Sequence, residues 1–297
     1  MATELPAATA TSLIWALCQR LEFFAEHQPL QLEQLTFGQL TQTFRVKTDQ
    51  GHYAVRHYAD SVLPVRRQQE LRCQHAAAAA GLAPAPLCLN NHQRMLVCEY
   101  LSDAEHTSAD KLHQHLATVL ARLAVLHQLK VQTPVLDPWL YLQHLKQQLS
   151  MDWATADESL YQQLLEQARQ LQFFLPEVGL CHMDLNPANL LWSAGQLWLI
   201  DFEYCQLADI CFDLASLCWN YGLDEEAEQH VLALYTQARG KQASAIDKHK
   251  YQLVKRLTLG FAWLWYKAEQ LKNRDPRHQE AAATTRRQLL QLLSQTA

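Results

Sequence analysis

The chain has 297 residues, of which 49% are hydrophobic and 19% are charged, so it can build a sizeable core as one large domain or two lobes. Its formal net charge of −5 gives no electrostatic basis for binding nucleic acid or an anionic membrane. No apolar run is as long as a membrane span requires. The first residues do not follow the pattern of a signal peptide, because Glu4 and Pro6 interrupt them and no basic residue precedes Arg20.

The eight cysteines form no Cys-x-x-Cys pair, and most of them lie among apolar residues. Reduced, buried thiols are typical of cytoplasmic proteins, so we expect that location. The chain also contains 14 histidines. His113 and His115 are close in sequence, but two positions apart on a helix they point in different directions, and no metal site is expected there.

Hydrophobic periodicity and turn residues divide the chain into a strand-rich first third and a largely helical remainder. We expect strands around Leu35 and over 41–48, 52–58, 86–89, 95–100, 190–192 and 196–200. We expect helices over 8–27, 64–80, 109–127, 140–149, 160–174, 208–220, 225–239, 244–271 and 279–293. Turns are indicated at 48–51 and 193–195, and Gly81 is typical of a helix end.

The change from strands to helices falls near residue 100, and no Gly/Ser-rich linker marks it. One compact unit with two lobes and a cleft between them is therefore expected. We place the N-terminal lobe at 1–98 and the C-terminal lobe at 99–297. The expected fold class is α+β, with a small antiparallel-sheet lobe followed by a larger, mainly helical lobe.

The most informative segment runs from residue 180 to residue 215 and contains Asp184, Asn189 and Asp201. Asp184 and Asn189 lie in a Pro-containing loop, and Asp201 ends the second strand of the hairpin that follows. Because a hairpin folds back on itself, it can return Asp201 to the loop. Magnesium prefers oxygen ligands and is usually held by one or two side chains plus substrate phosphates. A further carboxylate can accept the proton of an attacking hydroxyl, so the set favours phosphoryl transfer.

These residues resemble a known family. His182-x-Asp184-x4-Asn189 is followed, eleven residues after the Asn, by Ile-Asp-Phe at 200–202. With Leu-Asn-Pro after the first Asp and Asp-Phe-Glu-Tyr at the second, the segment is similar to the aminoglycoside phosphotransferase, choline kinase and thiamine kinase group of the kinase fold. The resemblance implies a two-lobed, protein-kinase-like fold, with ATP and Mg²⁺ as cofactors.

The resemblance also implies roles for five residues of this segment. Asp184 would be the catalytic base, and Asn189 and Asp201 would be the magnesium ligands. His182 and Asp213 would support the loop without taking part in the reaction.

Two departures from protein kinases bear on the acceptor. Met183 and Glu203 stand where protein kinases usually carry Arg and Gly. Asp201 and Asp213 are twelve positions apart, which is too short for a long activation loop. These features argue against a protein substrate, and a free small alcohol is the better acceptor.

On the nucleotide side, the resemblance implies six ATP-binding or supporting residues: Gly38, Thr41, Arg56, Glu70, Glu99 and Leu101. Gly38 and Thr41 belong to the segment that would cover the phosphates, although an ordinary turn explains them equally well. Glu99 and Leu101 belong to the expected hinge, where adenine would bond to the main chain.

Arg56 stands where the kinase fold has a phosphate-binding Lys, and a guanidinium can bridge two phosphate oxygens. A solvated strand Arg is the alternative. Glu70 would pair with that cation and hold it on the phosphates. A surface ion pair with a neighbouring Arg of its own helix is the competing explanation for Glu70.

The acceptor side is less certain from sequence alone. Glu203, Tyr204, Trp263 and Trp265 are the candidate substrate-binding residues. The two tryptophans belong to an aromatic run over 261–266, whose rings either hold a cation by cation–π contact or pack the core. Phe261 and Trp265 share one helix face and Trp263 and Tyr266 another, so only one pair is expected to line a site.

The sequence therefore predicts a phosphotransferase for the hydroxyl of a small cationic alcohol, of choline or thiamine type. An aminoglycoside-type phosphotransferase and a non-catalytic nucleotide-binding protein are the alternatives. We expect a monomer or homodimer that binds neither nucleic acid nor membrane.

Overall fold

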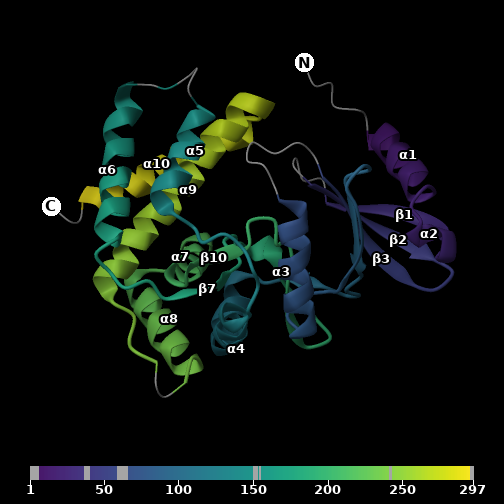
Figure 1. The fold of residues 1–297 in the computed structure, drawn as a ribbon, viewed down its shortest axis with the longest axis horizontal. Coiled ribbons are helices and arrows are strands. Elements are labelled where there is room, and N and C mark those ends of the chain that lie inside the picture. Colours follow the sequence, from purple (N-terminus) through teal and green to yellow (C-terminus); the bar gives the residue numbers. More distant parts are fainter. Residues whose placement is uncertain are drawn as a thin grey trace.

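The computed structural model describes residues 7–36, 41–58, 66–149, 153, 155–240 and 243–294. A small lobe built on an antiparallel sheet lies beside a larger, mostly helical lobe (Figure 1). This arrangement confirms the predicted fold class. Among the described helices, none combines the length and the apolar character needed to cross a membrane.

The described strands are β1 (Pro29–Thr36), β2 (Thr41–Thr48), β3 (His52–Tyr58), β4 (Pro86–Asn90), β5 (Met95–Glu99), β6 (Glu105–His106), β7 (Val178–Cys181), β8 (Leu190–Ser193), β9 (Gln196–Leu199) and β10 (Gln206–Asp209). The described helices are α1 (Ala7–Cys18), α2 (Phe23–Glu26), α3 (Arg67–Ala79), α4 (Ala109–Gln128), α5 (Pro138–Gln147), α6 (Thr155–Leu171), the 3-10 turn η1 (Pro187–Asn189), α7 (Cys211–Asn220), α8 (Glu225–Ala238), α9 (Lys248–Asn273) and α10 (Pro276–Ser294).

The small lobe is a five-stranded sheet in the order β1-β2-β3-β5-β4. Side chains alternate between its two faces, as the two-residue period of a strand requires. Met95 and Val97 of β5 pack in a cluster with α1 and α2, whereas Leu96 and Cys98 face the other way, in a cluster that includes Leu71 of α3. The sheet is thus covered on both faces, and α3 lies between it and the helical lobe (Figure 1).

The single helix predicted over 8–27 is wrong. The chain instead leaves α1 after Cys18 and forms the separate short helix α2. Leu21 and Phe24 are 2% and 3% exposed and pack in the same cluster as Ile14. The break lets residues on both sides of it reach the sheet, and burying these side chains outweighs the hydrogen bonds of an unbroken helix.

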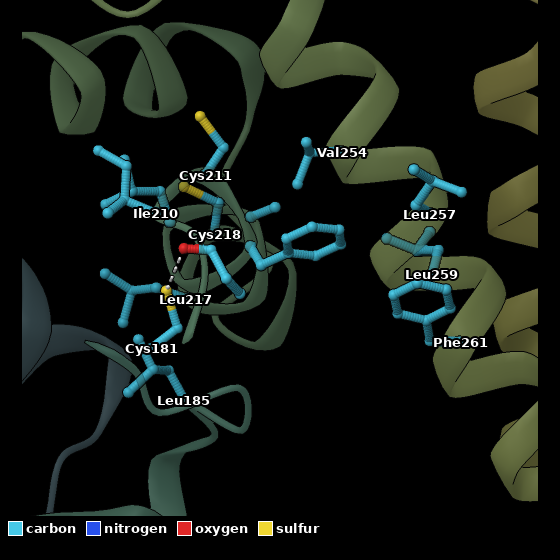
Figure 2. Close-up of a cluster of buried hydrophobic side chains, with 14 of the residues drawn as sticks. Cys181, Leu185, Ile210, Cys211, Leu217, Cys218, Val254, Leu257, Leu259 and Phe261 are labelled. Atoms are coloured by element: carbon cyan, nitrogen blue, oxygen red, sulfur yellow. Dashed lines mark hydrogen bonds between the residues drawn. The ribbon is translucent and has the colours of Figure 1, made fainter. Parts of the chain in front are cut away.

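The core of the large lobe surrounds α7, whose first two turns are completely buried. Figure 2 shows Cys211, Leu217 and Cys218 of α7 in one cluster with Cys181 and with Val254 of α9. A helix that is apolar on all sides must be enclosed in this way. Its first residues therefore have fixed positions, and one of them is Asp213.

Three short strands of the large lobe were not predicted. β7 and β10 pair with each other, and β6 pairs with β8. β10 uses residues assigned to the start of a helix at 208, so that helix begins at Cys211 instead. Strands this short carry little local signal, because their hydrogen bonds join residues more than 20 positions apart.

Polar contacts fasten α3 and the turn after it to the large lobe. Gln69 of α3 donates to the Cys205 carbonyl at 2.9 Å. The Leu199 N–H donates to the Leu82 carbonyl at 2.8 Å, and Arg122 donates to the carbonyls of Gly81 and Leu197. The helix that carries Glu70 is thus positioned by the lobe that contains residues 180–215.

Candidate active site

A tight hairpin places Asp201 beside Asn189. Ser193 pairs with Gln196, and the two residues between them have φ of +52° and +72°, as a two-residue type I′ turn requires. Register then aligns Leu190 with Leu199, and the Ile200 N–H donates to the Asn189 carbonyl at 3.1 Å. Asp201 is the next residue, so local chain geometry alone brings it to the loop.

Two amide side chains hold the carboxylate of Asp184. Asn186 Nδ2 donates to both carboxylate oxygens at 3.0 Å, and Asn189 Nδ2 donates to Oδ2 at 2.8 Å and to the Asp184 carbonyl at 3.0 Å. Because the Asn189 nitrogen is bonded to Asp184, its Oδ1 remains the atom that can bind a cation. Pro187 and the Asn186 side chain, which accepts from the Ala188 N–H, start the 3-10 turn that presents Asn189.

Asp213 fixes the backbone immediately before Asp184. Its fully buried carboxylate accepts the N–H of His182 and the N–H of Met183, both at 2.8 Å. Met183 has φ of +70°, an unfavourable conformation for a bulky residue that these bonds help to maintain. His182 Nε2 lies 2.8 Å from the Ile200 carbonyl and so ties this loop to the residue before Asp201.

Arg56 connects the small lobe to Asp201 of the large lobe. Its guanidinium contacts Glu70 at 2.6 Å and Asp201 at 2.5 Å. The Glu70 side chain is buried and pairs with Arg56 rather than with an Arg of its own helix. The alternatives of a solvated Arg56 and a surface Glu70 pair are therefore wrong.

A cavity of about 950 Å³ between the lobes gathers most of the predicted site residues. Its lining includes Arg56, Glu99, Leu101, Asp184, Asn189, Asp201, Glu203, Tyr204 and Trp265. Glu70 lies behind Arg56. Gly38 and the side chain of Thr41 lie outside the part of the chain that the structure describes.

The residues predicted to form a hinge, Glu99 and Leu101, lie at and just after the end of β5. The Glu99 N–H donates to the Ala85 carbonyl, and the Glu99 carboxylate accepts the Ala85 N–H, both at 2.9 Å. The Glu99 N–H is thus used within the protein.

The aromatic run of α9 divides between the cavity and the core. Phe261, Trp265 and Tyr266 line the cavity. Trp263 is 1% exposed, does not line the cavity, and packs near Trp153 with ring centroids 6.1 Å apart. The assignment of Trp263 to the substrate is therefore wrong, because its helix face points into the lobe. Of the two pairs, only Phe261 and Trp265 line the cavity together, and Tyr266 of the other pair lines it without Trp263.

Two carboxyl groups of the cavity have raised pKa values. Burial raises the pKa of Glu203 to about 9, and the negative charge of Asp201 contributes. Burial also raises the pKa of Asp184, again with a contribution from Asp201. A carboxyl group in this situation gains most from a nearby positive charge, so this part of the cavity favours cations.

Comparison with known proteins agrees with this geometry. A model of the phosphotransferase enzyme family matches residues 31–253. The chain belongs to the phosphotransferase enzyme family.

Individual relatives are more distant. Over 93 residues the chain is 32% identical to protein LicA of Haemophilus influenzae, a match that covers 30% of this chain and 35% of LicA. The curated relative is thus matched over about a third of its length. The choline kinase LicA of Streptococcus pneumoniae has the same fold, with a TM-score of 0.84 at 19% identity over 96% of this chain and 99% of that one. A structure of LicA in complex with AMP gives a TM-score of 0.79 at 20% identity, over 96% and 98% of the two chains.

Several cavity residues of this phosphotransferase were missed. Tyr141 of α5 lines the cavity and packs edge-on against Phe261, with ring centroids 4.7 Å apart. Trp219 at the end of α7 and His278 at the start of α10 also line it. They lie in three separate helices without a common motif, so only the packing of the helices identifies them.

Proposed function

We propose that the protein transfers the γ-phosphate of ATP, with Mg²⁺, to the hydroxyl of a small cationic alcohol of choline or thiamine type. One observation carries the proposal. Asp184, Asn189 and Asp201 line the same cavity as the aromatic side chains of Trp265 and Tyr266. The first three residues suit phosphoryl transfer, and the aromatic rings suit a cationic acceptor.

The donor set fits magnesium. The Asn189 amide oxygen and the Asp201 carboxylate are hard oxygen ligands of the kind that Mg²⁺ selects, and two protein ligands leave room for phosphates and water. When bound, the ion would neutralise charge on the phosphate oxygens. Arg56, anchored by Glu70, adds a fixed positive charge from the small lobe at the same place.

Asp184 is the proposed base. It would accept the proton of the acceptor hydroxyl as that oxygen attacks the γ-phosphorus. Its carboxylate is held by Asn186 and Asn189, so its orientation is set before the substrate arrives. Burial raises its pKa, and a more basic carboxylate is a better proton acceptor as long as it stays ionised.

The acceptor end combines rings and negative charge. A quaternary ammonium or thiazolium group would rest against Trp265, Tyr266 and Tyr204, and each ring contact contributes roughly 0.5–2 kcal/mol. Glu203 adds a carboxyl whose ionisation a bound cation would favour. An aminoglycoside, which carries several dispersed ammonium groups, makes less use of such a ring-lined wall.

The test is a measurement of ADP release by the purified protein with ATP, Mg²⁺ and one acceptor at a time: choline, ethanolamine, thiamine or kanamycin. We expect turnover with choline or thiamine and none without Mg²⁺. Turnover on kanamycin alone would contradict the choice of acceptor. Tight ATP binding without transfer to any acceptor would contradict catalysis of this kind.

A further inference from the structure

A second set of buried polar groups lies behind the catalytic loop, where none of them can touch a substrate. His127 at the end of α4 has Nε2 at 3.0 Å from Asp213 Oδ2 and Nδ1 at 2.5 Å from the Tyr235 hydroxyl of α8. His127 is 7% exposed, Asp213 0% and Tyr235 1%. Neither His127 nor Tyr235 lines the cavity.

The chemistry of the partners fixes the direction of each hydrogen bond. Asp213 already accepts two backbone N–H groups, so its carboxylate acts as acceptor and His127 Nε2 must donate. In a neutral imidazole, Nδ1 then accepts the hydroxyl proton of Tyr235. The result is a series of hydrogen bonds. Tyr235 orients the His127 ring, the ring orients the Asp213 carboxylate, and the carboxylate holds the backbone of His182 and Met183.

Close packing between β7 and α4 supports the same series of hydrogen bonds. Gly179 of β7 lies so close to α4 that a Cβ there would be 2.8 Å from the His127 carbonyl and 2.9 Å from its Cβ. Two residues later β7 ends at Cys181, and the catalytic loop follows. The backbone of His127 is therefore in close contact with the strand that leads into the loop. Its side chain contacts Asp213, whose carboxylate accepts the backbone N–H groups of that loop.

We propose that His127 is a positioning residue for the catalytic loop, acting through Asp213 on the backbone of Met183, with Tyr235 setting the orientation of its ring. The consequence for phosphate transfer rests on the proposed role of Asp184. The consequence for the loop does not depend on any substrate. Without the His127 donor, the Asp213 carboxylate keeps its two backbone partners, His182 and Met183, but loses the contact from α4 that orients it, so it holds the strained backbone at Met183 less firmly.

The test compares His127→Leu with His127→Gln in the full chain. Leu fills the space but removes the donor, whereas Gln can place an N–H near the position of Nε2. Hydrogen exchange, followed by mass spectrometry, reports on a peptide covering 180–186. We expect His127→Leu to speed exchange there by about tenfold or more, as loss of a buried hydrogen bond implies. His127→Gln should restore most of the protection, and a peptide from α9 should not change in either variant.

Equal acceleration in α9 would show general destabilisation and would overturn the proposal, as would unchanged exchange at 180–186. If His127→Leu does not fold, hydrogen exchange in the Tyr235→Phe variant tests the proposal instead. It should speed exchange at 180–186 by a smaller factor, while Tyr161→Phe, a change at an equally buried Tyr beside Trp153, should not. No effect of Tyr235→Phe would count against the proposal.

Kinetics separates this role from the proposed function. Once the acceptor screen supplies a substrate, His127→Leu should lower kcat with little change in the KM for ATP or acceptor, and His127→Gln should recover much of it. A rise in KM with kcat unchanged would contradict a role in positioning Asp184. If no acceptor is phosphorylated, the exchange measurement still decides whether His127 holds the loop.

Discussion

The segment at 180–203 and the aromatic run at 261–266 both contribute side chains to the same cavity, yet these side chains are placed by different means. In the first, neighbours in sequence fix the geometry: Asn186 and Asn189 hold Asp184, and a two-residue turn returns Asp201 to Asn189. In the second, every residue belongs to one regular helix. Its orientation within the lobe alone decides which rings reach the cavity.

The difference shows how far a short motif can specify a site. A motif made of loops and turns contains its own geometry, because its hydrogen bonds are local. The sequence of an aromatic helix specifies only which residues share a face. The direction in which each face points depends on the helices packed around it. Substitutions in the two regions should therefore act on different quantities.

The largest effect is expected for Asp184→Ala, which removes the proposed base. It should lower kcat by roughly 10²–10⁴-fold, the usual contribution of general-base catalysis. The melting temperature should change little, because the variant loses the unfavourable burial that raises the pKa of this carboxyl, and Asn189 Nδ2 keeps its bond to the backbone carbonyl of residue 184. ADP release with the best acceptor measures the loss, and Asp110→Ala on the exposed surface of α4 serves as the control. An Asp184→Ala protein with unchanged activity would show that Asp184 is not the base.

Next in size is Trp263→Ala. Because this ring is packed inside the large lobe, its loss should lower the free energy of unfolding by about 3–5 kcal/mol, measured by urea denaturation. KM for the acceptor should stay close to that of the unmodified protein under conditions where the variant is folded. A large rise in KM without loss of stability would place Trp263 at the substrate after all.

A smaller effect is expected at the connection between the lobes. Glu70→Gln keeps the shape of the side chain but removes the charge that Arg56 contacts, so the free energy of unfolding should fall by about 1–3 kcal/mol. Glu33→Gln, which breaks an exposed pair with Arg45 in the same sheet, should cost no more than about 1 kcal/mol. If both variants lower the free energy of unfolding by the same amount, the buried Arg56–Glu70 pair contributes no more to stability than the exposed pair.

The smallest effect is expected for Trp265→Ala, two positions from Trp263 on the same helix. Losing one cation–π contact should raise KM for a cationic acceptor by about 2- to 30-fold, with stability nearly unchanged. The two tryptophan variants are matched in chemistry and differ only in the face they occupy. If both variants change KM and stability by the same amounts, the cavity face and the core face of α9 do not differ in function.

Most of the fold could be read from sequence. The strands of the small lobe, the hairpin at 190–199 and most helices of the large lobe follow from periodicity, turns and helix ends. The failures share one cause. The break after Cys18 and the strands β7 and β10 are favoured by contacts with distant residues, and local patterns do not record such contacts.

The sequence by itself predicted which residues come together: a loop with Asp184 and Asn189, and a hairpin that returns Asp201 to that loop. Those residues act through short-range geometry or through the fixed register of neighbouring strands. Only the tertiary structure decided that Trp265 faces the cavity and Trp263 the core, that Tyr141 lines the cavity, and that His127 contacts Asp213. In each of these cases the decisive contact joins helices far apart in the chain, and it forms only when the whole lobe packs.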